Sequence, residues 1–170
     1  MRGKWAAGIS PKHFTWVIKG SLAVAERPGG FTVNHRRVRR QEEVIWLAEQ
    51  GFTKIISLLG TNHNLASYEE RHLASATYAL PAVGDPTVVL TACFADLAQS
   101  LTTKQKVLLH HDELGDKVLG TTAGFLLWSG RVTSGPQAIA VIEHLAARPL
   151  GPRGRELVAA SMTLPSLSST

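Results

Sequence analysis

Short apolar runs along the chain predict strands. Four of these runs are rich in apolar or β-branched residues and are followed by polar or glycine-containing segments. They are Trp16–Ile18, Leu22–Val24, Thr53–Leu59 and Val107–His110. A fifth strand is predicted over Thr77–Ala82. The run that includes Val107, Leu108 and Leu109 is apolar without alternation, which is typical of a strand buried on both faces.

Apolar residues at helical spacing alternate with these runs. They predict helices over Arg36–Gln50, Thr87–Leu101 and Leu119–Val132, and a helical turn over Tyr68–Ala74. The segment from Ser134 to Gln137 reads as a capping box that opens a further helix. Pro149 ends that helix, and Pro152 opens a last one that reaches about Met162.

The alternation of strands and helices predicts a single α/β domain with a mostly parallel central sheet flanked by helices. A chain of 170 residues is long enough for about one such domain. The pattern contains no internal repeat and no interdomain linker.

A glycine-containing loop follows the apolar run at 107–109. It holds Gly115 and Gly120, and a helical pattern begins within it. A buried strand, a glycine loop and a helix N-terminus together form the usual layout of an anion site. The sequence therefore places its candidate chemistry between His111 and Gly120.

This loop resembles the phosphate loop of the cysteine-dependent tyrosine and dual-specificity phosphatases. Alignment on the glycines puts His111 at the family's histidine, Asp112 at its nucleophilic cysteine and Val118 at its arginine. Alignment on the first histidine puts His111 at the cysteine and Lys117 at the arginine, but it mismatches both glycines. We prefer the first alignment, and neither one supplies a cysteine or an arginine.

The resemblance extends over residues 13–162. The segment His13–Gly30 is similar to the opening of small atypical dual-specificity phosphatases, and Tyr78–Asp85 resembles the strand that delivers their general-acid aspartate. An Arg-Pro pair, Arg148 and Pro149, also stands where this family has one. The resemblance implies a phosphatase-like domain over 13–162, an extension over 1–12 and a disordered tail over 163–170, with Asp85 at the acid position.

This chain resembles the family but lacks the reactive cysteine and arginine of its loop. The resemblance therefore implies a pseudophosphatase that binds, scaffolds or regulates a protein partner. Asp112, Glu113 and Asp116 oppose Lys117, and like charges 4 Å apart repel by about 4 kcal/mol at an effective dielectric of about 20. We therefore expect phosphate to bind weakly or not at all, with the Asp112 carboxylate capping the loop amides instead. The altered phosphate loop comprises Glu113, Leu114, Gly115, Asp116, Lys117, Val118 and Gly120.

An enzyme with altered chemistry is the main alternative. Asp112 or His111 could act as a phosphoryl acceptor, assisted by a metal ion. Adjacent His110 and His111 on a strand point to opposite faces, however, so they cannot both bind one ion. We therefore predict no metal site and no cofactor. Asp85 precedes a proline, where an aspartate is often simply a helix cap, so its presence at the acid position is weak evidence for acid catalysis.

A second alternative is binding through charge. The net charge is +5, and Arg36, Arg37, Arg39 and Arg40 form a basic cluster that could attract nucleic acid or an acidic partner. The chain has no zinc finger and no RNA-binding aromatic signature, so a solvated helical turn is the favoured interpretation. We expect a protein partner rather than nucleic acid, and nothing in the sequence predicts an oligomeric state.

The remaining sequence features concern environment. No segment approaches the roughly 20 apolar residues that a membrane span needs, so we expect no membrane partner. The single cysteine, Cys93, lies in an apolar helical run and is expected in the core. One cysteine suits a reducing compartment, and we expect a cytoplasmic protein.

Overall fold

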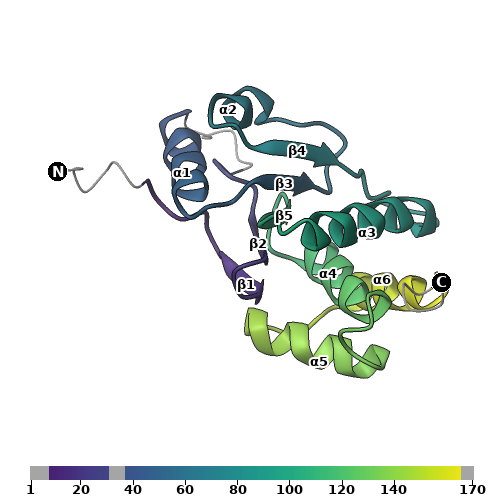
Figure 1. Cartoon of the computed structure of the whole chain (residues 1–170). Helices are drawn as coiled ribbons and strands as arrows, with labels where there is room; N and C mark the ends of the chain where they lie inside the picture. Colours follow the sequence, from purple (N-terminus) through teal and green to yellow (C-terminus); the bar gives the residue numbers. More distant parts are fainter. Residues whose placement is uncertain (1–7, 31–36, 166–170) are drawn as a thin grey trace.

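The computed structural model describes residues 8–30 and 37–165, and it shows one sheet with helices on both faces (Figure 1). The five strands lie in the order β1-β2-β5-β3-β4. β1 pairs antiparallel to β2, and the other neighbouring strands are parallel. The strands are β1 (Thr15–Ile18), β2 (Leu22–Glu26), β3 (Lys54–Ser57), β4 (Ala74–Thr77) and β5 (Val107–His111).

The helices form two layers around this sheet. Helices α1 and α2 lie on one side, and α3 to α6 lie on the other (Figure 1). The architecture is the predicted single α/β domain. The helices are α1 (Arg37–Glu49), α2 (Leu65–Glu70), α3 (Thr87–Thr102), α4 (Asp116–Trp128), α5 (Gly135–Ala146) and α6 (Pro152–Met162).

Successive residues of the central strands contribute to different layers. Leu22 and Val24 of β2 belong to the core under α3 to α6, whereas Ala23 and Ala25 pack toward α1 and α2. β5 divides its side chains in the same way, because neighbouring side chains of a strand point to opposite faces. Burial on both faces explains why these strands read as continuous apolar runs.

Aromatic side chains fill both cores. Phe14, Trp16, Trp46 and Phe52 pack with ring centroids 4.9 to 5.9 Å apart in the α1 and α2 layer. Trp128 packs against Phe94 and Phe125 in the other layer. Cys93 is fully buried beside this second group, and burial raises the pKa of its thiol. The expected core role of Cys93 is confirmed.

Three elements begin three residues earlier than predicted. The helical turn expected over Tyr68–Ala74 is α2, at Leu65–Glu70, and Ala74 is instead the first residue of β4. The strand expected over Thr77–Ala82 is β4, a short strand of four residues at Ala74–Thr77 that pairs with β3 at Lys54–Ser57. The helix expected over Leu119–Val132 is α4, which starts at Asp116 and ends at Trp128. Small residues such as Ala74 carry little strand propensity, so pairing with β3 decides their conformation.

One half of the predicted capping box at α5 is confirmed. Ser134 Oγ accepts a hydrogen bond from Gln137 N at 3.2 Å. The Gln137 side chain reaches back to Thr133 N at 2.9 Å rather than to Ser134. Pro152 opens α6, and that helix ends at Met162, as predicted.

The chain ends that are described pack onto the domain. Ile9 lies in the segment that we expected to be an extension, and its backbone N–H donates to Glu42 O of α1. At the other end Trp128 Nε1 donates to Pro165 O at 2.6 Å, in the expected tail. Residues 1–7 and 166–170, the remainder of both segments, lie outside the described residues. Within the described residues, no helix is both long and apolar enough to cross a membrane.

Candidate functional site

A cavity of about 370 Å³ lies where the carboxyl end of β5 meets the N-terminus of α4. The carboxyl ends of parallel strands commonly carry ligand sites in α/β sheets. The sequence predicted chemistry here, and the structure brings most of the predicted residues together. The cavity is lined by His111, Asp112, Glu113, Gly115, Asp116, Lys117 and Arg153.

Asp112, at the nucleophile position in the preferred alignment, forms an ion pair with Arg27. Its Oδ1 atom lies 3.1 Å from Nη1 of Arg27, which follows β2. Oδ1 is buried and makes no hydrogen bond, although the Asp112 side chain as a whole is 37% exposed. The loop amides make no hydrogen bond to this carboxylate, and α4 begins at Gly115 without a side-chain cap. Our expectation that Asp112 caps the loop is therefore wrong, because Arg27 offers it a full opposite charge.

Asp116 is held by a second helix. Its two carboxylate oxygens accept hydrogen bonds from Gly151 N at 2.9 Å and Gly154 N at 3.1 Å. These amides belong to the first turn of α6, where a negative charge is favourable. An acid of the loop therefore acts as the cap of α6.

Lys117 and Val118 take different positions, which bears on the two alignments. Lys117 lines the cavity, while Val118 is fully buried in the core under α4. Lys117, the loop cation that faces the cavity, is thus the residue that stands at the family's arginine in the second alignment. Asp112 and His111 both line the cavity, so the lining residues do not separate the alignments on the nucleophile side.

The glycines of the loop act differently from one another. A Cβ atom at Gly120 would lie 2.6 Å from the Cα of Gly154, so this glycine permits close contact between α4 and α6. A Cβ atom at Gly115 would meet nothing within 4 Å. Gly115 also has a φ of −127°, which any residue adopts.

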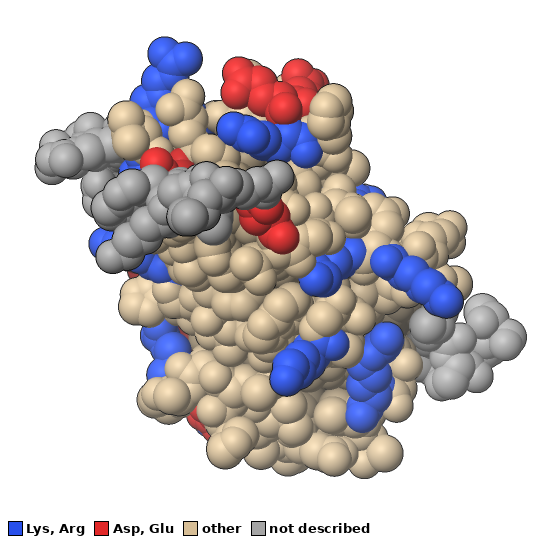
Figure 2. Space-filling view, turned by 60° about the vertical axis from the view of Figure 1, so that its left-hand side comes forward, with Lys and Arg blue, Asp and Glu red and all other residues tan. Residues whose placement is uncertain are grey.

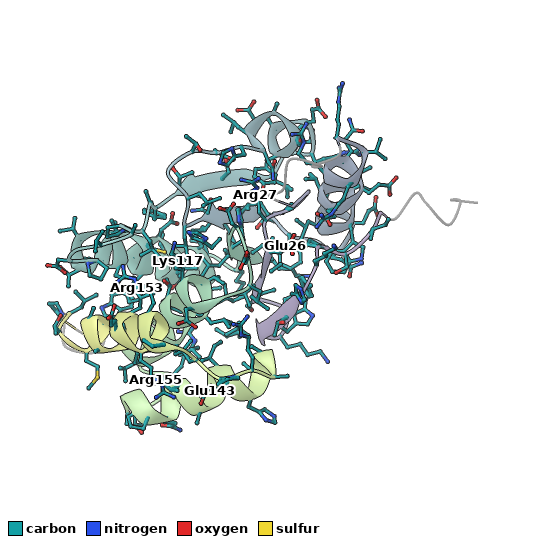
Figure 3. The ribbon with its side chains drawn as sticks, turned by 180° about the vertical axis from the view of Figure 1, so that it is seen from behind. Glu26, Arg27, Lys117, Glu143, Arg153 and Arg155 are labelled. Carbon is teal, nitrogen blue, oxygen red and sulfur yellow. The ribbon has the colours of Figure 1, made fainter. Side chains whose placement is uncertain are left out.

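Arg153 is the main residue of the cavity that the sequence did not assign to it. It comes from α6, and its Nη2 donates to Pro81 O at 2.7 Å, which ties it to the segment before α3. Figure 3 shows Arg153 and Lys117 together near the N-termini of α6 and α4, with Glu26 and Arg27 farther along. The ion pair of Arg153 with the exposed Glu156 is solvent-accessible and therefore weak.

These contacts change the charge balance predicted from the sequence. Arg27 neutralises Asp112, and the α6 amides stabilise Asp116. Lys117 and Arg153 then face the cavity with Glu113, which is exposed. The net negative cavity expected from the loop residues alone is therefore not what the fold produces.

The two histidines have separate environments. His110 is fully buried, with Nδ1 3.0 Å from His111 O, and burial lowers its pKa to about 4. His111 lines the cavity, where burial and then Lys117 lower its pKa while Asp112 opposes the shift. Both imidazoles are therefore neutral at pH 7. The predicted divergence of the two side chains is confirmed.

Asp85 lies on the exposed segment before α3 and does not line the cavity. Its Oδ1 accepts a hydrogen bond from Thr87 N at 2.9 Å, and this bond lowers the pKa of Asp85. A general acid needs a pKa raised toward the working pH, so this environment is unsuited to that role. Asp85 thus accepts from the first amide of α3 and lies one residue before Pro86, the N-cap of that helix.

The predicted arginine cluster is divided. Arg37 is exposed, whereas Arg39 forms ion pairs with Glu43 at 2.9 Å and Glu26 at 3.2 Å. Arg40 is half-buried, and Arg36 lies outside the described residues. Arg39 therefore belongs to a partly buried ion-pair network and not to an open basic surface. On the face shown in Figure 2, Lys and Arg side chains occur in small groups with uncharged residues between them.

A metal site is not formed by the residues proposed for one. Among residues 8–30 and 37–165, no three His, Cys, Asp or Glu side chains come together in a group that could hold an ion. Asp112 is committed to Arg27, and Asp116 to the α6 amides.

No protein-family model matches the chain, and no curated protein sequence matches it. Solved structures do match its fold. Kinase associated phosphatase has a TM-score of 0.72 at 18% identity, with 88% of this chain and 93% of that chain covered. The core catalytic domain of the PP-IP phosphatase Siw14 from S. cerevisiae has a TM-score of 0.67 at 15% identity, covering 89% of this chain and 86% of that one.

A third similar structure is the human tyrosine phosphatase-like serine/threonine/tyrosine-interacting protein. Its TM-score is 0.63 at 12% identity, and the match covers 88% of this chain and 93% of that chain. Identities this low establish a shared fold and nothing finer. The chain therefore has the fold of the tyrosine and dual-specificity phosphatases, as the sequence predicted.

Proposed function

We propose that this chain is a catalytically inactive phosphatase-like protein, a pseudophosphatase, whose cavity binds an acidic group of a protein partner without hydrolysing it. The observation that carries this proposal is the ion pair between Asp112 and Arg27, at the position that corresponds to the catalytic cysteine in the preferred alignment.

The chemistry of this position argues against phosphoryl transfer. A cysteine phosphatase needs a thiolate nucleophile and a guanidinium on the phosphoryl oxygens. Here a carboxylate stands at the first position, and fully buried Val118 stands at the second. Asp85, with its lowered pKa, is poorly suited to protonate a leaving group. The residues at these three positions are therefore unsuited to the reaction of a cysteine phosphatase.

The same cavity retains features that suit binding. Lys117 and Arg153 face it, and it opens at the N-terminus of α4, where backbone amides favour an anion. One protein of similar fold is itself named a phosphatase-like interacting protein. An acidic or phosphorylated side chain is the partner group that this charge arrangement favours.

Hydrolysis assays test the inactive part of the proposal. We expect no release of p-nitrophenol from p-nitrophenyl phosphate above the level of the Asp112→Ala variant, with EDTA or with added Mg²⁺, Mn²⁺ or Zn²⁺. Turnover by the wild-type chain that disappears in Asp112→Ala or His111→Ala would establish an enzyme instead.

Thermal unfolding with sulfate or phosphate tests the binding part. A ligand that binds only the native state stabilises it by about 1.4 kcal/mol at ten times its Kd. We expect both anions to raise the midpoint of the wild-type chain, and Lys117→Met and Arg153→Met to abolish the rise. Lys19→Met, an exposed cation outside the cavity lining, is the control. An equal rise in all four proteins would show binding elsewhere.

A further inference from the structure

We propose that Asp112 is an internal competitor: its carboxylate pairs with Arg27 and keeps this third cation away from an incoming anion. The inference rests on the proposed function, because it concerns regulation of the same cavity. Removing the charge of Asp112 would then convert a weak anion site into a strong one, with Arg27, Lys117 and Arg153 as its cations.

Arg27 is placed to be that third cation. Its backbone N–H donates to Asp112 O at 3.3 Å, and its Nε donates to Gly30 O at 2.9 Å. These two bonds hold the residue beside the loop whether or not its Nη1 contacts Asp112. The Arg27 side chain is 12% exposed, so the guanidinium is already largely withdrawn from water.

Asp112 separates this guanidinium from the cavity. Asp112 lines the cavity and Arg27 does not, while the atom that Arg27 contacts is the buried Oδ1. Oδ1 makes no hydrogen bond, so the ion pair alone holds this oxygen. An anion entering beside Lys117 would meet the Asp112 charge directly and could reach Arg27 only by displacing it.

Glu113 provides the contrast that makes the inference testable. It lines the same cavity and carries the same charge as Asp112, but it is exposed and has no ion pair with Arg27. Neutralising Glu113 changes the general potential of the cavity, whereas neutralising Asp112 also releases Arg27.

Isothermal titration with sodium sulfate tests the proposal, since sulfate stays a dianion across the working pH range. We expect Asp112→Asn to bind sulfate at least tenfold more tightly than the wild-type chain, and Glu113→Gln to change affinity by less than threefold. The double variant Asp112→Asn with Arg27→Met should lose the gain. Equal gains from Asp112→Asn and Glu113→Gln, or a gain that survives Arg27→Met, would overturn the proposal.

A second measurement covers the case in which the double variant does not fold. The Arg27 Nε–H resonance should shift on sulfate addition in Asp112→Asn and stay unchanged in the wild-type chain. A resonance that is unchanged in both proteins would overturn the proposal.

The outcomes separate the two proposals. Sulfate binding that depends on Lys117 but is unaffected by Asp112→Asn removes the internal competitor and leaves the proposed function standing. Hydrolysis of a phosphate ester by the wild-type chain removes the proposed function, while the Asp112→Asn comparison still reports on Arg27. Failure of every variant to bind sulfate overturns the competitor and the anion-binding part of the proposed function together.

Discussion

The acidic side chains of the loop have separate roles. Asp112 pairs with Arg27, Asp116 caps α6, and Glu113 is exposed at the cavity. The prediction from the sequence counted these three acids together as one group of negative charges. Their partners lie far away along the chain, at Arg27 and Gly151, so no local pattern could reveal them.

The role of Asp116 predicts a loss of stability on substitution. Asp116→Ala should lower the free energy of unfolding by about 1 to 2 kcal/mol, since it leaves two amides of α6 without their acceptor. Glu113→Ala, in the same loop but exposed, should stay within about 0.5 kcal/mol of the wild-type chain. Urea unfolding of both variants measures the difference, and equal losses would refute the capping role.

Buried His110 predicts a dependence of stability on pH. Burial lowers its folded-state pKa to about 4, so the unfolded chain binds more protons between pH 6.5 and 4. The contribution of neutral, buried His110 to the free energy of unfolding is therefore fully present above about pH 6.5. It decreases as the pH falls toward 4, by at most about 3 kcal/mol.

The variant His110→Asn tests this sign. Asparagine keeps a donor for His111 O but does not titrate. Unfolding in urea at pH 7 and pH 5 should show a smaller loss for the variant than for the wild-type chain. The same loss in both proteins would assign the effect to other groups.

At the scale of elements, the contact between α4 and α6 depends on Gly120, a glycine inside α4. Gly120→Ala should destabilise the domain by about 1 to 3 kcal/mol, because its Cβ would lie within 2.7 Å of the Gly154 backbone. Gly115→Ala meets open space and should cost only about 0.5 to 1 kcal/mol, because alanine is a poorer N-cap residue than glycine. Thermal unfolding of the pair measures this, and comparable losses would contradict the packing account.

Element predictions succeeded where local signals exist. The start of α6 at Pro152 and the cap of α5 at Ser134 follow from short-range chemistry. β4 was misplaced because its small residues take their conformation from pairing with β3. The start of α4 was placed at Leu119, whereas the helix begins at Asp116, directly after Gly115.

At the scale of the molecule, one sheet supports two cores, and this predicts that both layers unfold together. Trp16 and Trp46 report on the α1 and α2 layer, and Trp128 on the other. The variant Trp128→Phe leaves only the tryptophans of the α1 and α2 layer as reporters, and the double variant Trp16→Phe with Trp46→Phe leaves only Trp128. In each variant, the midpoint of unfolding followed by fluorescence should coincide with the midpoint followed by far-UV circular dichroism. Trp5 would be replaced by Phe throughout. A fluorescence transition that precedes the dichroism in either variant would show independent layers.

The fold was predictable from the sequence because its strands are buried on both faces and therefore read as apolar runs. The cavity was predictable only in part. Position along β5 and α4 identified Asp112, Lys117 and their neighbours, but Arg153 enters from α6 through the tertiary packing of that helix. Charge counted along a loop therefore misjudged the potential of a site built from three separate segments.

The burial of Val118 has a consequence for any attempt to revive catalysis. This side chain is fully enclosed beneath α4, in a helix that contacts α6 without room for a Cβ at Gly120. An unpaired guanidinium there would cost several kcal/mol, a large share of the roughly 5 to 15 kcal/mol that stabilises a domain. Restoring a cysteine at 112 is a local edit, but restoring an arginine at 118 requires a new helix interface. Under the preferred alignment, single substitutions in the loop therefore cannot rebuild both reactive groups, whereas Lys117, the arginine position of the second alignment, already faces the cavity.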